Sequence, residues 1–405
     1  MAITRYFWQI CAVAGTLAGA TTGFADETSP EPAAEVGAAT VTTSGDPFGD
    51  EVGPGLGIRS LVQTRYMQTW PTSSRTGERD LSQANDGWTL NRAFVRIAGQ
   101  VSPELSGRFM VDFADLQRNN TVRAIKFAYA QWAPSSRVKV TAGLFKRLFS
   151  LLELLPIADY EFADTGLGDT LIKDTGFGGR DIGAEVSIRP LAKKRWLKMQ
   201  LAAYQGGHVG SDSRVDGLIN GRLESTPIKN LHLGADLAWR RRATTLGNQT
   251  ADGQQDAGWA WSADAMWQKK HYEIRGEVLG GDRTDIAYRH NPETGQDARK
   301  FLGWWLLAVA KVPLGKTILL PAARVEWLDV DRDKPVGAHW LSSAALNLDI
   351  SANLRFLVDF TVHRVQAGTM PLSQVPQGAA DQGGVWLPFH DVNDTRATVQ
   401  IQAKI

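Results

Sequence analysis

Polar and apolar side chains alternate along most of this chain with a period of two residues. In the stretch 92–101, for example, Ala93, Val95 and Ile97 alternate with Arg92 and Arg96. Such alternation is typical of a β-strand with one apolar and one polar face. The pattern recurs in about 16 segments of roughly 9–13 residues, the length of a tilted strand that crosses a bilayer.

The connections between these segments alternate between short turns and long polar loops. The long ones cover residues 71–87, 150–180, 206–221, 281–298 and 367–389. Several tryptophans stand near strand ends: Trp70, Trp88, Trp132, Trp196, Trp239, Trp327 and Trp340. A transmembrane barrel combines tight turns on one side, longer loops on the other and aromatic girdles at both interfaces. We therefore predict an all-β fold, a transmembrane antiparallel β-barrel of about 16 strands. A soluble sandwich or ligand-binding barrel, with its apolar faces turned inward, is the alternative.

The alternation stops within the stretch RVKVTAGLFKRLFSLLELL, residues 137–155. Its first half reads as a strand, whereas Lys146 and Arg147 precede an irregular apolar run. A barrel of this size encloses a wide interior, so we expect residues 150–180 to form a constriction loop folded into the lumen. Lys146 and Arg147 would stand at its root, where side-chain charge selects ions most strongly. An external loop that packs on a neighbouring subunit is the alternative.

The N-terminal residues depart from the strand pattern. Residues 1–25 combine Arg5, an apolar core and a small-residue cleavage site, the layout of a secretory signal peptide; a short transmembrane anchor is the alternative. Residues 26–55 are rich in Pro, Ala, Gly and acids, which predicts a flexible acidic leader. Residues 56–405 would then form the barrel. The only cysteine, Cys11, lies in the signal, so the mature chain would carry no thiol.

Charge is divided unevenly between these parts. The chain has 44 Lys and Arg against 43 Asp and Glu. Removing Arg5 and the seven acids of residues 26–55 leaves 43 against 36, so the barrel segment carries a net charge of +7. Small anions are therefore the favoured partners.

The polar faces of the early strands carry a basic track. Its members are Arg59, Arg65, Arg92, Arg96, Arg108 and Lys139. The planar guanidinium group pairs with phosphate oxygens and keeps its charge at any working pH, which suits a pore wall. Acids share the polar faces: Asp112, Asp181, Glu185, Asp236, Asp264, Glu273, Glu277 and Asp359. A cross-strand ion pair with one of these acids is the alternative role for each arginine.

From Leu90 onward the sequence resembles the phosphate-selective porin O/P family of Gram-negative outer membranes. The stretches that carry the resemblance are LNRAFVRIAGQVSPELSGRFMVDFAD, FAYAQWAPSSRVKVTAGLFKRLFS and GGRDIGAEVS. The most specific motif is Gly143-Leu144-Phe145-Lys146 with Phe149-Ser150, similar to the family's G-Q-F-K-x-P-F-G/S. The second is Arg180-Asp181-Ile182-Gly183, similar to R-D-x-G. Leu144 and Leu148 depart from the family's Gln and Pro.

This resemblance implies a sixteen-stranded, usually trimeric barrel whose pore is lined by arginines and narrowed by an infolded loop with lysines. Arg180, in the second motif, joins Lys146 and Arg147 in the expected pore-lining set. We expect a passive outer-membrane channel for small anions, phosphate or polyphosphate among them, surrounded by outer-membrane lipid and assembled as a homotrimer. A general diffusion porin with little anion preference is the alternative.

Motifs for catalysis are weak in this sequence. The stretch AKVPLGKT, residues 310–317, loosely fits a P-loop, but Pro313-Leu314-Gly315-Lys316 is typical of a hairpin turn. The seven histidines show no metal-ligand spacing, and no partner for His363 is visible in the sequence. No G-x-S-x-G motif occurs. We expect no catalytic residue, metal, cofactor or nucleic-acid partner; an outer-membrane barrel enzyme and a secreted β-rich binding protein are the remaining alternatives.

Overall fold

The computed structural model describes residues 55–73, 86–117, 124–190, 196–206, 217–243, 255–283, 299–330, 332, 338–365 and 392–405. All of them belong to one unit, residues 41–405. The signal peptide expected at residues 1–25 lies outside the described residues, as does all but the last residue of the leader expected at 26–55.

Within these ranges the chain forms sixteen long strands. They are β1 (Gly55–Thr69), β3 (Gly87–Gln100), β4 (Leu105–Asp112), β5 (Ile125–Trp132), β6 (Val138–Lys146), β7 (Arg180–Ile188), β8 (Leu197–Tyr204), β9 (Gly217–Ile228), β10 (Leu231–Ala243), β11 (Gln255–Lys269), β12 (Tyr272–Arg283), β13 (Arg299–Ala310), β15 (Thr317–Asp329), β16 (Ala338–Ser351), β17 (Leu354–Val365) and β18 (Val392–Lys404). Two short strands, β2 (Thr72–Ser73) and β14 (Val312–Leu314), and a short helix, α2 (Phe113–Gln117), lie in the connections.

Each long strand pairs antiparallel with the next one along the chain, and β18 pairs with β1 to close the sheet. In the closing ladder Leu61 lies opposite Lys404, and Thr69 lies opposite Arg396. Closure pairs the wall's backbone groups with neighbouring strands, as a segment surrounded by lipid requires. The predicted barrel of about 16 antiparallel strands is confirmed.

The alternation in the sequence sets the two faces of this wall. On β7, Ile182, Val186 and Ile188 are exposed, whereas Asp181 and Ser187, at alternate positions of the same strand, are buried. Tryptophans at strand ends are also exposed, namely Trp70, Trp88, Trp132, Trp196 and Trp340. The apolar face therefore points outward and the polar face inward, as in a lipid-facing barrel. The alternative of a soluble barrel with an apolar-inward wall is excluded for these strands.

The connections alternate between two lengths, as the sequence predicts. Only two residues separate β9 from β10 and β11 from β12, whereas 33 residues separate β6 from β7. Because β1 starts and β18 ends on the side of the short turns, both ends of the wall lie there. None of the helices in the described part is long and apolar enough to cross a membrane.

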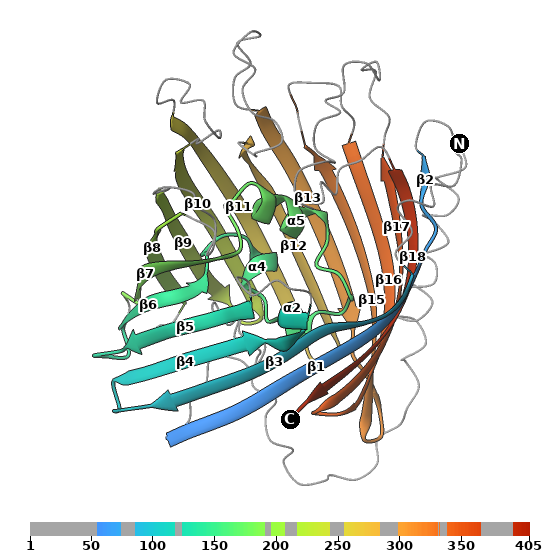
Figure 1. The fold of residues 1–405 in the computed structure, drawn as a ribbon, viewed down its shortest axis with the longest axis horizontal. Helices are drawn as coiled ribbons and strands as arrows, with labels where there is room; N and C mark the ends of the chain where they lie inside the picture. Colours follow the sequence, from blue (N-terminus) through green and yellow to red (C-terminus); the bar gives the residue numbers. More distant parts are fainter. Residues whose placement is uncertain are drawn as a thin grey trace. The chain divides into compact units, whose positions relative to one another are not determined.

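Residues 147–179, which we call the infolded segment, lie inside the barrel (Figure 1). The segment contains α4 (Leu151–Leu154), the 3-10 turn η2 (Ile157–Asp159) and α5 (Leu167–Asp174). The predicted helical turn before Pro156 is confirmed as α4. Burial of these elements within the lumen excludes the alternative of an external loop.

A hydrophobic core forms inside the barrel, between the infolded segment and one side of the wall. Leu152 and Leu171 of the segment and Leu279 and Trp305 of β12 and β13 are all buried in it. A Cβ atom at Gly168 in α5 would lie 3.3 Å from Leu279 and 3.9 Å from Trp305, so the helix touches the wall closely. The apolar run FLGWWLLAVA in β13 therefore has one apolar face pointing outward and a second toward the segment. At these strands the inward face of the wall is apolar and contacts the infolded segment.

Candidate functional site

The two cations at the root of the infolded segment, Lys146 and Arg147, donate hydrogen bonds to its backbone carbonyl oxygens. Arg147 is 1% exposed; its guanidinium donates to the carbonyl oxygens of Gly176 (2.5 Å) and Gly178 (3.1 Å) and to Asp181 (2.8 Å). The ammonium of Lys146 donates to the carbonyl oxygens of Glu153 and, at 3.4 Å, of Leu155. Both cations thus hold the ends of the segment in place.

Carboxylates on the opposite wall hold the middle of the segment. Asp236 on β10 accepts the backbone N–H of Ser150 at 3.1 Å, and Glu277 on β12 accepts that of Leu151 at 3.1 Å. Glu326 on β15 accepts from Leu167 (2.7 Å), and Asp359 on β17 accepts from Ala163 (2.8 Å). Because buried N–H groups without a partner cost free energy, these carboxylates stabilise the segment inside the lumen. We call Asp236, Glu277, Glu326 and Asp359 the wall carboxylates.

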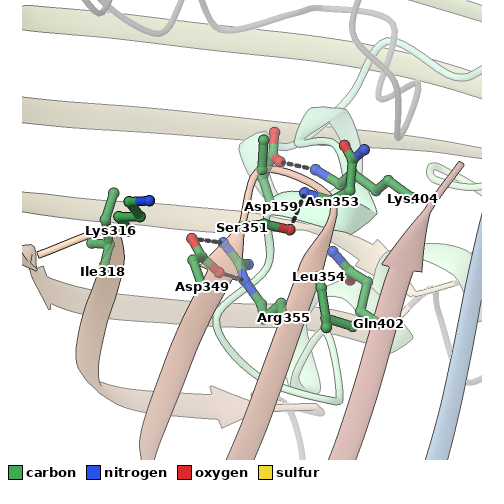
Figure 2. Close-up of a pocket in the computed structure, with 11 residues that line it drawn as sticks. Asp159, Lys316, Ile318, Asp349, Ser351, Asn353, Leu354, Arg355, Gln402 and Lys404 are labelled. Atoms are coloured by element: carbon green, nitrogen blue, oxygen red, sulfur yellow. Dashed lines mark hydrogen bonds and ion pairs between the residues drawn. The ribbon is translucent and has the colours of Figure 1, made fainter. Parts of the chain in front are cut away.

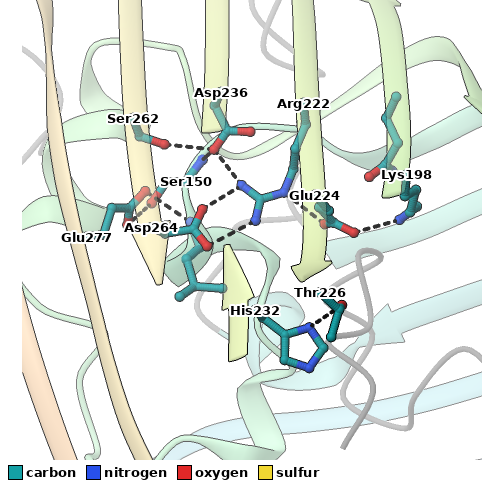
Figure 3. A network of polar contacts seen from close by, with 12 residues as sticks. Ser150, Lys198, Arg222, Glu224, Thr226, His232, Asp236, Ser262, Asp264 and Glu277 are labelled. Carbon is teal, nitrogen blue, oxygen red and sulfur yellow. Dashed lines mark hydrogen bonds and ion pairs between the residues drawn. The ribbon is translucent and has the colours of Figure 1, made fainter. Parts of the chain in front are cut away.

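A cluster of charged side chains surrounds Arg222 on β9 (Figure 3). Its guanidinium lies 2.6 Å from Asp236 and 2.9 Å from Asp264, and its Nε atom lies 2.8 Å from Glu224. Among the described residues, Asp236, Asp264 and Glu277 form a carboxylate group of the size that could hold a metal ion. The guanidinium already supplies the positive charge there, and Ser150 and Leu151 occupy further carboxylate oxygens. The cluster fits a structural anchor better than a metal site.

One carboxylate of the infolded segment forms ion pairs with two arginines of the wall. Asp164, in the infolded segment, lies 2.9 Å from Arg65 on β1 and 2.6 Å from Arg396 on β18. Burial alone would raise the pKa of Asp164, but the charges of Arg65 and Arg396 hold it well below its usual range. The Asp164 side chain is 43% exposed, so this group faces water in the lumen. Arg396 also lies 2.6 Å from Asp394 on the same strand, so two cations and two anions balance at this point.

Two basic groups of the early strands, Arg92 and Arg108, each contact a neutral side chain. Arg92 donates to the amide oxygen of Gln63 at 2.6 Å, and the Arg108 guanidinium lies 5.8 Å from the ring centre of Tyr129. Arg96 lies directly opposite Arg59 in the β1–β3 ladder. Strands β1, β3 and β4 therefore bring four of the predicted cations onto one inward face. We call Arg59, Arg92, Arg96 and Arg108 the basic wall.

The other two predicted cations lie elsewhere. Lys139 is half-buried near the short-turn end of β6, opposite Ser187 of β7. Arg180, at the start of β7, places its guanidinium 5.3 Å from the ring centre of Phe127. Neither joins the basic wall.

An ion pair within α5 ties the helix to α4. Lys173 lies 2.5 Å from Asp169 and 3.1 Å from Glu153. Burial would raise the pKa of Asp169, but the charge of Lys173 and hydrogen bonds from its neighbours lower it to about 2. Asp169 therefore stays ionised across the range in which ordinary carboxyl groups titrate.

A cavity of about 390 Å³ opens where short turns meet the infolded segment (Figure 2). Arg355 pairs with both oxygens of Asp349, at 2.5 and 3.0 Å, and Lys404 lies 3.4 Å from Asp159. Lys316 also lines the cavity. The cavity thus carries charges of both signs, in contrast to the basic wall.

Sequence reasoning missed Asp164, Arg222, Glu326 and Arg396. The last three stand at inward positions of alternating strands, so the period-two pattern could have indicated them. Asp164 lies in the infolded segment, where no periodicity applies. Only the folding of the segment shows that it meets Arg65 and Arg396.

Comparison with known proteins agrees with this architecture. The model of the family "Phosphate-selective porin O and P" matches residues 74–273, which confirms the resemblance seen in the sequence. No curated protein sequence matches the chain.

Solved structures match the barrel at low sequence identity. The anion-selective porin from Comamonas acidovorans has a TM-score of 0.57 and 10% identity, covering 87% of this chain and 99% of that chain. The outer membrane channel DcaP of Acinetobacter baumannii has a TM-score of 0.54 and 10% identity. The match covers 88% of this chain and 100% of that chain. The trimer form of OmpT from Vibrio cholerae has a TM-score of 0.51 and 11% identity. The match covers 87% of this chain and 100% of that chain. At such identities the likeness shows the porin fold.

Proposed function

Taking the match of residues 74–273 to the phosphate-selective porin O and P family and the closed porin barrel as premises, we propose that this protein is a passive outer-membrane channel for small anions, phosphate among them. One observation carries the anion preference. The wall carboxylates bind backbone N–H groups of the infolded segment, whereas Arg92 on the basic wall donates to the neutral amide oxygen of Gln63.

This arrangement of charged groups determines whether the lumen favours anions or cations. A carboxylate that accepts N–H bonds while buried against the segment is removed from the path of a solute. A guanidinium that donates to a neutral amide, as Arg92 does, keeps its positive charge. An anion can therefore exchange its hydration shell for these donors in steps along β1, β3 and β4.

Passage also requires that each site bind weakly. Arg65 and Arg396 meet this condition, because Asp164 already occupies part of their hydrogen-bonding capacity. An anion would compete with Asp164 instead of entering an empty charged pocket. The expected result is conduction through several weak sites without a single deep trap.

Reversal potentials in planar bilayers test the proposal. Full-length protein under a KCl gradient should give an anion-selective potential, and added phosphate should reduce the chloride current by competing for the basic wall. Arg92→Gln and Arg96→Gln should each move the potential toward neutrality. Arg241→Gln, which changes an exposed cation of β10 at an outward position of the strand alternation, is the matched control and should leave it unchanged. A cation-selective wild-type channel would overturn the proposal.

A general diffusion porin is the second candidate, and the ion pairs of the lumen favour it. Asp164 and the mixed charges of the cavity in Figure 2 weaken the net positive field. A wild-type reversal potential near zero, unaffected by phosphate, would support this candidate instead.

We also propose that the barrel sits in the outer membrane as a homotrimer. The exposed apolar belt and the closed sheet support a lipid environment. The trimer form of OmpT from Vibrio cholerae, which shares the fold, supports the assembly. Crosslinking of membrane-extracted protein should give a ladder that ends at three subunits; a ladder ending at one would contradict it.

A further inference from the structure

Three lysines gather at the short-turn end of neighbouring strands. Lys229 stands in the turn between β9 and β10, Lys269 ends β11, and Lys270 lies in the turn between β11 and β12. All three residues are exposed. The backbone N–H of Gln268 donates to the carbonyl oxygen of Asn230 at 2.9 Å, so the two turns lie side by side. The lysines therefore form one cluster on the rim of the barrel.

Two aromatic rings flank Lys269 on the outer face of the wall. Its ammonium lies 4.8 Å from the ring centre of Trp267 and 5.7 Å from that of Tyr272. The two ring centres are 5.1 Å apart. Lys269 lies directly opposite Tyr272 in the β11–β12 ladder, so strand register sets this contact. Such rings are typical of the boundary between the apolar core and the headgroups of a membrane.

The outer face next to this cluster is apolar. Leu233 on β10, Trp261 on β11 and Ile274 on β12 are all exposed. Trp267 joins the lysines to this face, because it lies opposite Ile274 in one ladder and opposite Leu231 in the other. In a barrel surrounded by lipid, such a face contacts acyl chains. An acyl chain along these strands would place its headgroup at the lysines.

The outer face of the cluster carries positive charge that no acid balances. None of the three lysines forms an ion pair with another residue of the described ranges. The described acids of β9 to β12 closest to this end point into the lumen, where each pairs with an arginine: Glu224, Asp236, Asp264 and Glu273. Three cations on one side of the wall therefore favour an anionic ligand over a zwitterionic one.

We propose that Lys229, Lys269 and Lys270 bind the headgroup phosphate of an anionic phospholipid whose acyl chains lie on β10, β11 and β12. This inference rests on the proposed outer-membrane location. Short turns of such barrels face the periplasm, so the lipid belongs to the periplasm-facing leaflet. Lysine binds phosphate as a compact point charge, and each lysine near an anionic lipid surface adds to the attraction. Free phosphate would use the lysines but not the apolar strands beside them.

Trp267 and Tyr272 position the ammonium of Lys269. A cation near an aromatic face is attracted by the ring, and the aliphatic stem of a lysine covers apolar surface. The ammonium is thereby held at the end of the apolar face, at the depth where a headgroup phosphate lies. Loss of the Trp267 ring should therefore weaken lipid binding although it changes no charge.

Native mass spectrometry of the folded full-length protein in a neutral detergent tests the site. With phosphatidylglycerol and phosphatidylcholine at equal concentration, wild type should retain one phosphatidylglycerol per chain and bind phosphatidylcholine at least fivefold more weakly. Lys269→Gln and Lys270→Gln should each weaken phosphatidylglycerol binding roughly fivefold, and Trp267→Leu should weaken it as well. Lys300→Gln, which removes an exposed lysine at the opposite end of the wall, is the matched control and should bind like wild type.

Folding and the source of the phosphate are controlled separately. Each variant is first checked for the faster gel migration of unheated, folded barrel, and a lysine variant that fails is replaced by the corresponding Lys→Met change. A tenfold excess of inorganic phosphate over lipid should leave phosphatidylglycerol bound. The proposal is overturned if inorganic phosphate displaces the lipid, if wild type binds both lipids equally, or if both lysine variants bind phosphatidylglycerol unchanged. A cation-selective channel would overturn the proposed anion preference and leave these results as they are.

Discussion

Two glycines allow β6 and β7 to approach their neighbouring strands closely. Gly143 has a φ of +130°, and it lies directly opposite Gly183 in the β6–β7 ladder. A Cβ atom at Gly143 would lie 2.3 Å from the carbonyl oxygen of Ala128, and one at Gly183 would lie 2.4 Å from that of Ala203. These are the glycines of the two motifs that carry the family resemblance. Close backbone approach therefore explains why both motifs contain glycine.

Gly143→Ala should destabilise the barrel because the new methyl group collides with backbone of β5. A strained position of this kind costs about 1–3 kcal/mol. The midpoint of urea unfolding in detergent measures the loss. Gly221→Ala is the matched control, since its Cβ atom would lie 4.0 Å from the closest neighbour. Equal midpoints for the two variants would show that β6 is not strained.

Asp164 controls how much positive charge the pore presents at Arg65 and Arg396. Asp164→Asn should increase anion selectivity and strengthen block by phosphate several-fold, because two guanidinium groups lose their shared partner. Single-channel current with increasing phosphate measures both effects. Asp159→Asn, at the exposed end of another loop ion pair, serves as the control. Unchanged phosphate block in Asp164→Asn would show that this cluster lies off the ion path.

At the scale of elements, the infolded segment is held by hydrogen bonds and by apolar packing together. Its backbone N–H groups meet the wall carboxylates, and its leucines meet Leu279 and Trp305. The sequence indicated that the segment enters the lumen and begins with a helical turn. It gave no sign of which wall the segment would contact, because the acids of the polar faces look alike in sequence.

The ion pair of Asp169 and Lys173 should make the anchoring of α5 depend on acid pH. The pKa of Asp169 is lowered in the folded chain to about 2, so its contribution is complete above the unfolded value of 3.8 and is lost as pH falls toward 2. The shift corresponds to about 2 kcal/mol. Asp169→Asn should therefore lower the thermal midpoint at pH 7, and its difference from wild type should vanish near pH 2. A difference that persists at pH 2 would assign the effect to packing.

At the scale of the whole molecule, the barrel encloses the infolded segment on one side of its lumen and leaves the basic wall on the other. Closure fixes the width of the lumen, and the infolded segment decides how much of it remains open. The ends of the segment are adjacent, since the Arg147 N–H donates to the carbonyl oxygen of Gly179 at 2.8 Å. A short linker can therefore replace the segment without opening the wall.

Replacing residues 150–176 by a short Gly-Ser linker should raise single-channel conductance several-fold and reduce anion selectivity. The same change should lower stability, because Leu279 and Trp305 would face water at a cost of about 1.5–3 kcal/mol each. Single-channel recording and thermal unfolding measure the two effects in one preparation. Wild-type conductance in the shortened protein would mean that the segment does not narrow the pore.

The sequence by itself determined the wall. A period of two residues sets which side chains face outward, and the lengths of strands and connections set the number of strands, because these are local properties of an extended chain. Tertiary structure alone decided what fills the lumen. The two apolar faces of β13, the contact of Asp164 with Arg65 and Arg396, and the meeting of His339 with His363 depend on register across strands and on the path of the infolded segment. Such contacts join residues far apart in the chain, and no local pattern encodes them.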